Sequence, residues 1–331
     1  MRFYLGFLIA FFVAICLSPI VIRFCKKLKF GQNILHYVES HASKQGTPTM
    51  GGLIFIIAII CVGLCFSYDN FMFGLICLLM FLGYGVIGFL DDFIKIKFKR
   101  NLGLRPYQKI IGQALIAVIA GVYVYINPNI GSEVVIPFIN KTIDLGVFII
   151  PFVFLVFIAT TNSVNLTDGL DGLAGGVSFV VFLSFGFLIL IFSKFLTPGL
   201  DETVISQMTI LSNISFVASG ALLGFLVFNC FPATIFMGDT GSLSLGGLLA
   251  VVATFSKLGL YVLIVGIMYV LSTLSVIIQV LYFKKTKKRV FLMAPLHHHF
   301  EKKGVYENKI VSIYIIITII VSLICIMAQF I

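Results

Sequence analysis

Long apolar runs recur along the whole chain and constrain its fold more than any other feature. A helix needs about 20 apolar residues to cross ~30 Å of hydrocarbon. Ten runs approach this length, at residues 3–22, 50–67, 71–90, 110–126, 145–161, 173–193, 209–228, 242–256, 259–283 and 311–331. A soluble domain is excluded, because 60% of the residues are apolar and only 11% are charged. We predict an all-α, polytopic integral membrane protein of about ten transmembrane helices.

Basic residues are concentrated in alternate connections between these runs. The connections 23–49, 91–109, 162–172, 229–241 and 284–310 hold 19 of the 23 Lys and Arg residues. The positive-inside rule places this set in the cytoplasm, so both termini are expected on the outer side. The net charge of +10 then follows from topology and from attraction to anionic lipid or anionic substrate. We predict no binding of nucleic acid.

Five aspartates lie in the same cytoplasmic set, each at or beside the end of an apolar run. A carboxylate so close to hydrocarbon is costly unless it is paired, binds a metal or faces water, which makes it a candidate functional group. Capping of the next helix is an alternative for the two that precede the run at 173. It suits the others less well, because the adjacent pair is expected to end a helix, where the dipole disfavours negative charge. The five are Asp91, Asp92, Asp168, Asp171 and Asp239.

The surroundings of these carboxylates favour a divalent cation and a phosphate. Oxygen ligands with no Cys or paired His nearby suit a hard ion, and Mg²⁺ takes one or two carboxylates while leaving other positions to water and phosphate oxygens. Basic side chains that follow in the same connection can neutralise further phosphate charge. They are Lys95, Lys97, Lys99, Arg100, Arg105 and Lys109. The sequence therefore predicts a magnesium site that acts on a phosphate or diphosphate.

The last cytoplasmic connection contains APLHHHFEKKG at residues 294–304. Three consecutive His residues cannot all face one metal from a regular helix or strand, so a zinc site made of His alone is not expected. Two alternatives remain, a solvated loop or an irregular turn that presents imidazoles to an anionic or sugar-phosphate ligand. The neighbouring lysines favour an anionic partner or lipid headgroups.

Five motifs in this order resemble the phospho-N-acetylmuramoyl-pentapeptide transferase family. They are Lys44 with TPTMGG, LDD ending at Asp92, NLTDGLDGLAGG from Asn165, NCFPATIFMGDTGSLSLGG from Asn229, and APLHHHFEKKG. This family belongs to the polyprenyl-phosphate N-acetylhexosamine-1-phosphate transferases. The resemblance covers residues 44–309, and the triple His motif separates the family from its relatives that transfer GlcNAc-1-phosphate.

The resemblance implies a reaction and a cellular place. Phospho-MurNAc-pentapeptide would pass from UDP-MurNAc-pentapeptide to undecaprenyl phosphate with Mg²⁺, giving UMP and lipid I, in the first membrane step of peptidoglycan synthesis. Residues 1–331 would form a single transmembrane catalytic domain in the bacterial cytoplasmic membrane, among its lipids, with the active site facing the cytoplasm. Direct attack by the lipid phosphate is preferred to a covalent aspartyl-phosphate step, because a deprotonated phosphate is already a competent nucleophile. A homodimer is plausible by resemblance, although Gly220 and Gly224 favour helix packing within the chain.

The resemblance also implies roles for individual residues. Asp239 would be the principal Mg²⁺ ligand, with Asp171 as a second metal ligand and a substrate contact, while Asp91 would deprotonate or orient the lipid phosphate beside Asp92. The expected substrate-binding residues are Lys44, Lys109, Asn165, Asp171, Asn229, His297, His298 and His299. The segment 304–313 departs from the family pattern, so no contact is carried over to Glu307 or Lys309.

Two alternatives remain open from the sequence. A GlcNAc-1-phosphate transferase would share the fold and the metal chemistry. A transporter or lipid flippase would use the carboxylates to carry ions, but the carboxylates lie at helix ends and no inverted repeat is evident.

Overall fold

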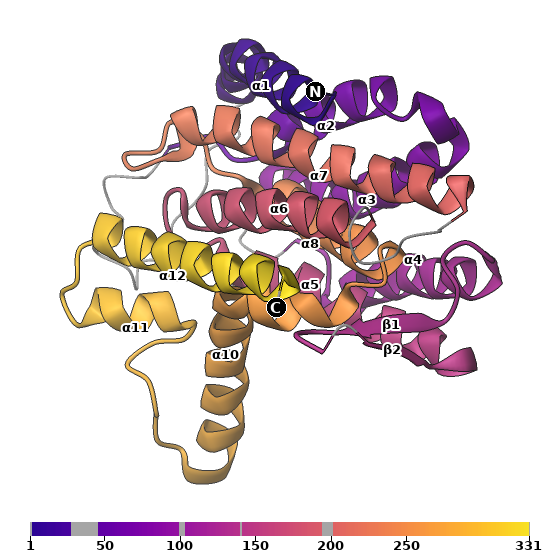
Figure 1. Ribbon diagram of the computed structural model, residues 1–331. Coiled ribbons are helices and arrows are strands. Elements are labelled where there is room, and N and C mark those ends of the chain that lie inside the picture. Colours follow the sequence, from indigo (N-terminus) through magenta and orange to yellow (C-terminus); the bar gives the residue numbers. More distant parts are fainter. Residues whose placement is uncertain (1, 28–45, 99–102, 140, 194–200, 331) are drawn as a thin grey trace.

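The computed structural model describes residues 2–27, 46–98, 103–139, 141–193 and 201–330. The fold is a bundle of long helices with a small two-stranded hairpin at one edge (Figure 1). The long helices are α1 (Arg2–Lys27), α3 (Phe71–Lys97), α4 (Pro106–Ile126), α5 (Ile149–Thr167), α6 (Leu173–Ile191), α7 (Glu202–Asn229), α8 (Gly238–Phe255), α10 (Ile267–Thr286) and α12 (Glu307–Met327). The shorter ones are α2 (Gly52–Cys65), α9 (Val262–Val265) and α11 (Leu296–Lys302).

The expected all-α membrane architecture is confirmed, with one adjustment to the number of spans. Within the described residues, 9 helices are long and apolar enough to cross a membrane. The predicted span at 50–67 is the one that falls short, because it corresponds to α2, whose 14 residues extend only about 21 Å. The expected span 259–283 is divided at Gly266, where α9 ends and α10 begins.

Helix α8 lies at the centre of the bundle. Its most apolar window is 89% buried, and it packs closely against α3 and α5. By contrast only 22% of the corresponding window of α10 is buried, and this helix projects away from the other helices in Figure 1. This most buried of the described long helices carries Asp239 in its first turn, so the position of that carboxylate is fixed by the core of the bundle.

The small-residue pair on α7 contacts α1. A Cβ added at Gly220 would lie 2.8 Å from the carbonyl carbon of Phe7, and one at Gly224 would lie 2.6 Å from the carbonyl oxygen of Phe11. These close approaches confirm the expected packing within the chain. A homodimer stays a prediction.

The hairpin is the part of the fold that the sequence did not predict. Strands β1 (Glu133–Ile136) and β2 (Lys141–Asp144) pair antiparallel, with Glu133 opposite Asp144. The connection after α8 holds the hairpin, because Lys257 accepts a backbone hydrogen bond from Val135 and pairs with Glu133 at 2.8 Å. The connection between α4 and α5, which was expected to be a loop, therefore contains a small hairpin at one edge of the bundle.

Candidate active site

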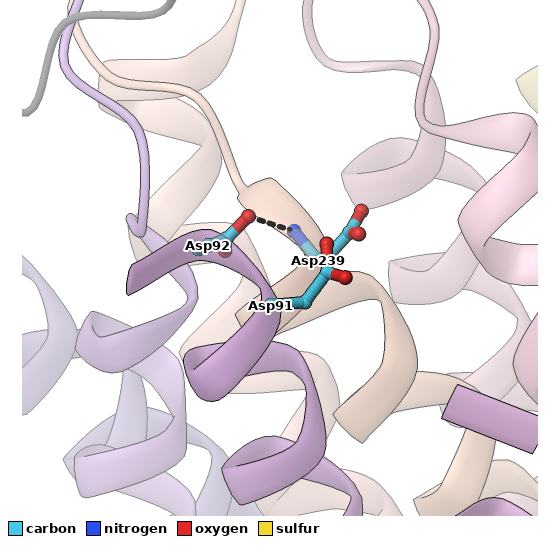
Figure 2. A group of neighbouring side chains, drawn as sticks. All are labelled: Asp91, Asp92 and Asp239. Carbon is cyan, nitrogen blue, oxygen red and sulfur yellow. Dashed lines mark hydrogen bonds between the residues drawn. The ribbon is translucent and has the colours of Figure 1, made fainter. Parts of the chain in front are cut away.

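Three of the predicted aspartates meet where α3 crosses the start of α8 (Figure 2). Asp91, Asp92 and Asp239 each offer a carboxylate oxygen, and these atoms all lie within 4.8 Å of one another. Asp91 and Asp92 are each 3% exposed. The expectation that this pair ends a helix is wrong, because α3 continues for five further residues to Lys97.

Asp92 holds the first turn of α8 from the neighbouring helix. Its Oδ2 accepts hydrogen bonds from the backbone N–H (2.9 Å) and the hydroxyl (2.7 Å) of Thr240, and its Oδ1 accepts one from the Asp239 N–H at 3.2 Å. Residues at the start of α8 supply no side-chain cap. Asp92 is therefore a capping carboxylate supplied by α3, and it satisfies N–H groups that a helix start leaves without partners.

Gly238 lets this capping carboxylate come close. Its φ of +73° lies in the left-handed region, which glycine adopts at little cost. A Cβ at this position would lie 2.6 Å from Asp92 Oδ2. The predicted start of the helix at residue 242 is therefore corrected to Gly238, which moves Asp239 from a loop into the first turn, where the helix dipole favours a negative charge.

Two lysines neutralise much of the charge of the cluster. Lys95 Nζ lies 2.6 Å from Asp91 Oδ2 and 2.9 Å from Asp239 Oδ2. Lys109 Nζ lies 2.6 Å from the same Asp239 oxygen. Lys109 was among the predicted site residues, whereas Lys95 was recognised only as one cation in a basic run. Its spacing of four residues after Asp91 is the signal that could have singled it out, once α3 is known to continue.

Asn165 also reaches the cluster from α5. Its side-chain amide donates to Asp239 Oδ1 and to the Ser242 hydroxyl, both at 2.8 Å. Both oxygens of Asp239 thus have partners, which fixes the orientation of the carboxylate. The predicted residues Asn165 and Lys109 are therefore brought together with the three aspartates, and their contacts to substrate stay predictions.

The carboxylates fit a divalent cation. Asp91 Oδ2 and Asp239 Oδ2 lie 2.6 Å and 2.9 Å from the same cation, the ammonium group of Lys95, while Asp91 Oδ1 accepts the Leu104 N–H at 2.9 Å. Asp91 and Asp239 thus present hard oxygen ligands to the same point, the donor set that Mg²⁺ prefers. The oxygens of Asp92 instead accept hydrogen bonds from the first turn of α8, and Lys95 Nζ is 3.8 Å away, so Asp92 suits a structural role better than direct ligation.

Asp171 lies beside the connection between α7 and α8. Its Oδ2 accepts a hydrogen bond from the Ala233 N–H at 3.0 Å, and its own N–H donates to Glu307 Oε1 at 2.7 Å. Helix α6 has Gly172 at its N-cap, a residue with no side chain that could cap the helix. Asp171 is not in the group of three clustered carboxylates, and its role as a metal ligand stays a prediction.

Asn229 fixes the same connection from the end of α7. Its Nδ2 donates to the Ile235 carbonyl at 2.9 Å, and its Oδ1 accepts from the Gly172 N–H at 3.2 Å. This 3%-exposed amide links the loops on either side of the site, so the structure gives it a positioning role. Its predicted substrate contact stays a prediction.

Asp168 is a partly buried carboxyl beside these loops. Burial, together with the negative charges of Asp239, Asp92 and Asp171, raises its pKa to about 8. At neutral pH this carboxyl therefore remains largely protonated and can donate a hydrogen bond. The sequence offered capping of the next helix as an alternative for Asp168 and did not predict a protonated carboxyl.

The His motif forms the short helix α11, where an irregular turn had been one expectation. His297 is fully buried, and neither ring nitrogen has a hydrogen-bond partner among the described residues. Burial, with a smaller contribution from the charge of His298, lowers its pKa to about 3. A Cβ at Gly169 would lie 3.0 Å from His298 Nε2 and would also collide with the His297 ring. The motif therefore packs on the loop that carries Asp168 and Asp171.

His298 and His299 point to different partners, as three consecutive residues must. His298 Nδ1 lies 2.9 Å from Glu301, and His299 Nδ1 accepts from the Leu292 N–H at 3.1 Å. The two rings thus have different neighbours, and the substrate contacts expected for the motif stay predictions. Lys44, the remaining predicted site residue, lies outside the described residues.

A buried carboxylate cluster with two lysines, at the end of a membrane helix bundle, is the arrangement of an enzyme that handles phosphates. Residues 72–257 match the model of Glycosyl transferase family 4, and residues 44–56 match phospho-N-acetylmuramoyl-pentapeptide-transferase signature 1. Proteins named phospho-N-acetylmuramoyl-pentapeptide-transferase from Clostridium novyi and Clostridium kluyveri are 47% and 48% identical to the chain. The alignments cover 96% of this chain in both cases, and 94% and 96% of the relatives. A third, from Caldanaerobacter subterraneus, is 45% identical over 95% of this chain and 94% of its own length. The chain belongs to the phospho-N-acetylmuramoyl-pentapeptide-transferase family.

Proposed function

We propose that this protein transfers phospho-MurNAc-pentapeptide from UDP-MurNAc-pentapeptide to undecaprenyl phosphate, giving lipid I and UMP. The observation that carries this function is the cluster of Asp91, Asp92 and Asp239 with Lys95 and Lys109, in a chain of this family. Phosphoryl transfer requires positioning and neutralisation of charge more than covalent chemistry, and this cluster supplies both.

Asp239 and Asp91 are the residues that would hold Mg²⁺, with Asp171 as the further ligand that the sequence predicts. When bound, Mg²⁺ supplies charge neutralisation at the donor diphosphate. Lys109 and Lys95 carry positive charge at the same point and would contact phosphate oxygens. Asn165 orients Asp239 through the 2.8 Å hydrogen bond to its Oδ1.

Asp91 is the better candidate for the group that orients the lipid phosphate, because a carboxylate that holds the cation is not free to take up a proton. Both oxygens of Asp92 accept hydrogen bonds from α8, whereas Asp91 Oδ2 faces the lysines of the cluster, with Lys95 Nζ at 2.6 Å and Lys109 Nζ at 3.8 Å. In the direct reaction, an oxygen of the lipid phosphate attacks the phosphorus attached to the sugar, the bond to UMP breaks, and UMP leaves with the electron pair. Rapid-quench trapping of a phosphorylated aspartate before lipid is added would instead establish a covalent step.

The loops around the cluster would bind the donor. His297 offers two buried ring nitrogens without partners in the described chain, beside the loop that contains Asp171. We assign His297, His298 and His299 to polar and phosphate groups of the donor, Asn229 to a position near the uridine, and Lys44 to a phosphate. Asp168, kept protonated by its raised pKa, adds a hydrogen-bond donor to this wall.

The location proposed for the enzyme is the bacterial cytoplasmic membrane. The distribution of Lys and Arg supports a cytoplasmic site and outward-facing termini. Such an orientation lets a soluble nucleotide donor and a lipid phosphate meet at the same surface. A homodimer is also proposed, on resemblance alone.

Release of UMP from purified protein tests the function. The wild type is expected to release UMP only with both substrates and Mg²⁺, and Asp239→Asn is expected to lose turnover by at least ~10²-fold while keeping its melting temperature. Asp201→Asn is a matched control, because Asp201 is exposed and makes no side-chain cap. Wild-type turnover by Asp239→Asn would contradict the assignment of the site.

Donor competition separates the two related transferases. UDP-MurNAc-pentapeptide is expected to be used in preference to UDP-GlcNAc, and the reverse preference would favour a GlcNAc-1-phosphate transferase. The transporter alternative gains no support from the comparisons, in which the relatives are named transferases. It would return only if the wild type released no UMP under any of these conditions.

A further inference from the structure

A layer of buried polar side chains lies deeper in the bundle than the carboxylate cluster, where α3, α4, α5 and α8 pack together. Gln113 of α4 and Tyr84 of α3 are both 0% exposed in this layer. A polar side chain buried inside a membrane bundle is costly, so it is by default a candidate functional group. Neither residue is one of the three clustered carboxylates, and neither has yet been given a role.

Gln113 joins α4 to both of its neighbours by hydrogen bonds. Its side-chain Oε1 accepts from Asn162 Nδ2 of α5 at 2.8 Å, and it lies 3.4 Å from the Thr161 hydroxyl. Its backbone carbonyl accepts from the Tyr84 hydroxyl of α3 at 2.9 Å. Three of the helices that carry site residues therefore meet at this one residue.

The bond between Gln113 and Asn162 lies one helical turn away from the site. Gln113 follows Lys109 by four residues, and Asn162 precedes Asn165 by three. Such spacings place two side chains on the same face of a helix. Lys109 and Asn165 meet on the carboxylate of Asp239, at 2.6 Å from Oδ2 and 2.8 Å from Oδ1. The bond thus fixes α4 to α5 close to the point at which both helices contact Asp239.

Helix α4 depends on such a bond more than its neighbours do. A Cβ at Gly247 of α8 would lie 2.5 Å from Tyr84 Cδ2, and one at Gly246 would lie 2.7 Å from the Thr160 carbonyl oxygen, so α3 and α5 are packed directly on the central helix. By contrast only 28% of the most apolar window of α4 is buried. The position of Lys109 therefore depends on few contacts.

The side-chain bond of Gln113 contributes little to stability. Asn162 Nδ2 also donates to the Ile158 carbonyl at 2.8 Å. The Thr161 hydroxyl likewise donates to the Phe157 carbonyl at 2.7 Å. Both groups keep a partner within α5 if Gln113 is replaced. Gln113 Nε2 has no hydrogen-bond partner among the described residues, a cost that an apolar side chain would avoid. We expect the amide to matter more for geometry than for stability.

We infer that Gln113 is a positioning residue, which sets the place of the Lys109 ammonium group at Asp239 by holding α4 against α5. It lies one turn away from the cluster and acts through Lys109. The consequence for the rate rests on the proposed function, whereas the effect on the ion pair between Lys109 and Asp239 does not.

Gln113→Met tests the inference, because Met is unbranched and of similar length but has no oxygen to accept the bond. The probe is an amine-reactive reagent, and mass spectrometry measures the labelling rate of Lys109 relative to the exposed Lys285 of the same protein. Lys109 Nζ lies 2.6 Å from Asp239 Oδ2 and its side chain is 18% exposed, so it is shielded while α4 is in place. Its relative labelling rate is expected to rise at least ~3-fold in Gln113→Met.

Three further variants complete the design. Gln329→Met makes the same change at another buried Gln and removes its 2.5 Å hydrogen bond to Tyr261, beyond the end of α12 that lies away from the site, so Lys109 should be labelled at the wild-type rate. Asn162→Ala removes the same bond from the α5 side, and should expose Lys109 as Gln113→Met does. Gln113→Glu keeps an oxygen at the same position, and a carboxyl buried without a cation stays neutral, so it should restore most of the protection.

Release of UMP adds a kinetic test. Gln113→Met should lower kcat by at least ~10-fold while its melting temperature stays within ~4 °C of the wild type. In a Lys109→Met background the same change should lower the residual kcat by less than ~2-fold, because Gln113 acts through Lys109.

Three results would overturn the inference. They are unchanged labelling of Lys109 in folded Gln113→Met and Asn162→Ala, an equal rise in labelling in Gln329→Met, and losses of kcat that are fully additive with Lys109→Met. A wild type that released no UMP would refute the proposed function, and the labelling rates would still decide the role of Gln113.

Discussion

Gly88→Ala should separate α3 from α8 at the point where Asp239 is held. A Cβ at Gly88 would lie 2.5 Å from the Asp239 carbonyl carbon and 2.7 Å from Thr240 Cα. Ordinary van der Waals contact begins at 3.4 Å, so the two backbones must move apart by about 1 Å. A misplacement of this size at a reacting centre costs on the order of 10²-fold in rate, which is the loss of kcat we expect.

The assay is UMP release per folded enzyme, with Gly83→Ala as the control on the same helix. A Cβ at Gly83 would lie 2.9 Å from Ile116 Cδ1, the end of a flexible side chain that can rotate away. Both variants add one methyl group to α3, but only Gly88→Ala meets the backbone of α8. Both are measured by melting temperature, because overpacking alone can cost ~1–3 kcal/mol of stability. Wild-type kcat in Gly88→Ala would refute the argument that this contact positions Asp239.

Three further predictions address the capping carboxylate, the buried imidazole and the metal. Thr240→Val removes the 2.7 Å hydrogen bond to Asp92 and should lower the free energy of unfolding by about 2 kcal/mol in thermal melts. Thr254→Val is the control, because it loses only a hydrogen bond within its own helix and should lower this free energy less. The folded pKa of His297 is about 3 against about 6.5 when unfolded, so stability is complete above pH 6.5 and falls on acidification. The loss between pH 7 and pH 5 should be about 2 kcal/mol, and a His297→Gln protein that kept the same acid slope would argue against this cause. Chelation should abolish UMP release and added Mg²⁺ should restore it, and Asp91→Asn should require more Mg²⁺ for half-maximal rate.

The membrane helices and the aspartate cluster were both predictable from the length of the apolar runs. Once the ends of the spans are assigned, Asp91, Asp92 and Asp239 must lie at one surface, because alternate connections share a side. That placement needs no knowledge of side-chain contacts. The structure brings these three residues together as the sequence predicted, along with Asn165 and Lys109.

The helix boundaries near the site were less predictable, because they depend on a partner far along the chain. An isolated helix should not continue past Asp91 and Asp92, and an isolated start at Gly238 has no good cap of its own. The two helices stabilise each other, because Asp92 of α3 caps the N–H groups at the start of α8 and these N–H groups stabilise the negative charge of Asp92. Contacts across 147 residues of sequence are invisible to local rules.

Dependence on distant parts of the chain also explains the hydrogen bonds of Asp171 and Asn229. An Asp just before an apolar run is typical of a helix cap, and local rules do not show that the Asp171 carboxylate also accepts the Ala233 N–H from a distant connection. Asn229 binds Gly172 and the Ile235 carbonyl, so the two residues link neighbouring loops in both directions. Short polar side chains satisfy whichever backbone groups lie nearest in the folded chain, and the tertiary fold decides which these are.

The balance of charge within the cluster is consistent with an enzyme that accepts both a cation and an anion. Three carboxylates face two ammonium groups, which leaves one formal negative charge. A divalent cation would reverse that sign, and the resulting positive site suits a diphosphate. Asp168 does not upset the balance, because its raised pKa keeps it largely neutral at pH 7. Without the two lysines the net charge would be −3, and a bound divalent cation would still leave the site negative. The lysines therefore matter for the phosphates of the substrates more than for the stability of the carboxylates, and the metal and the donor are expected to bind cooperatively.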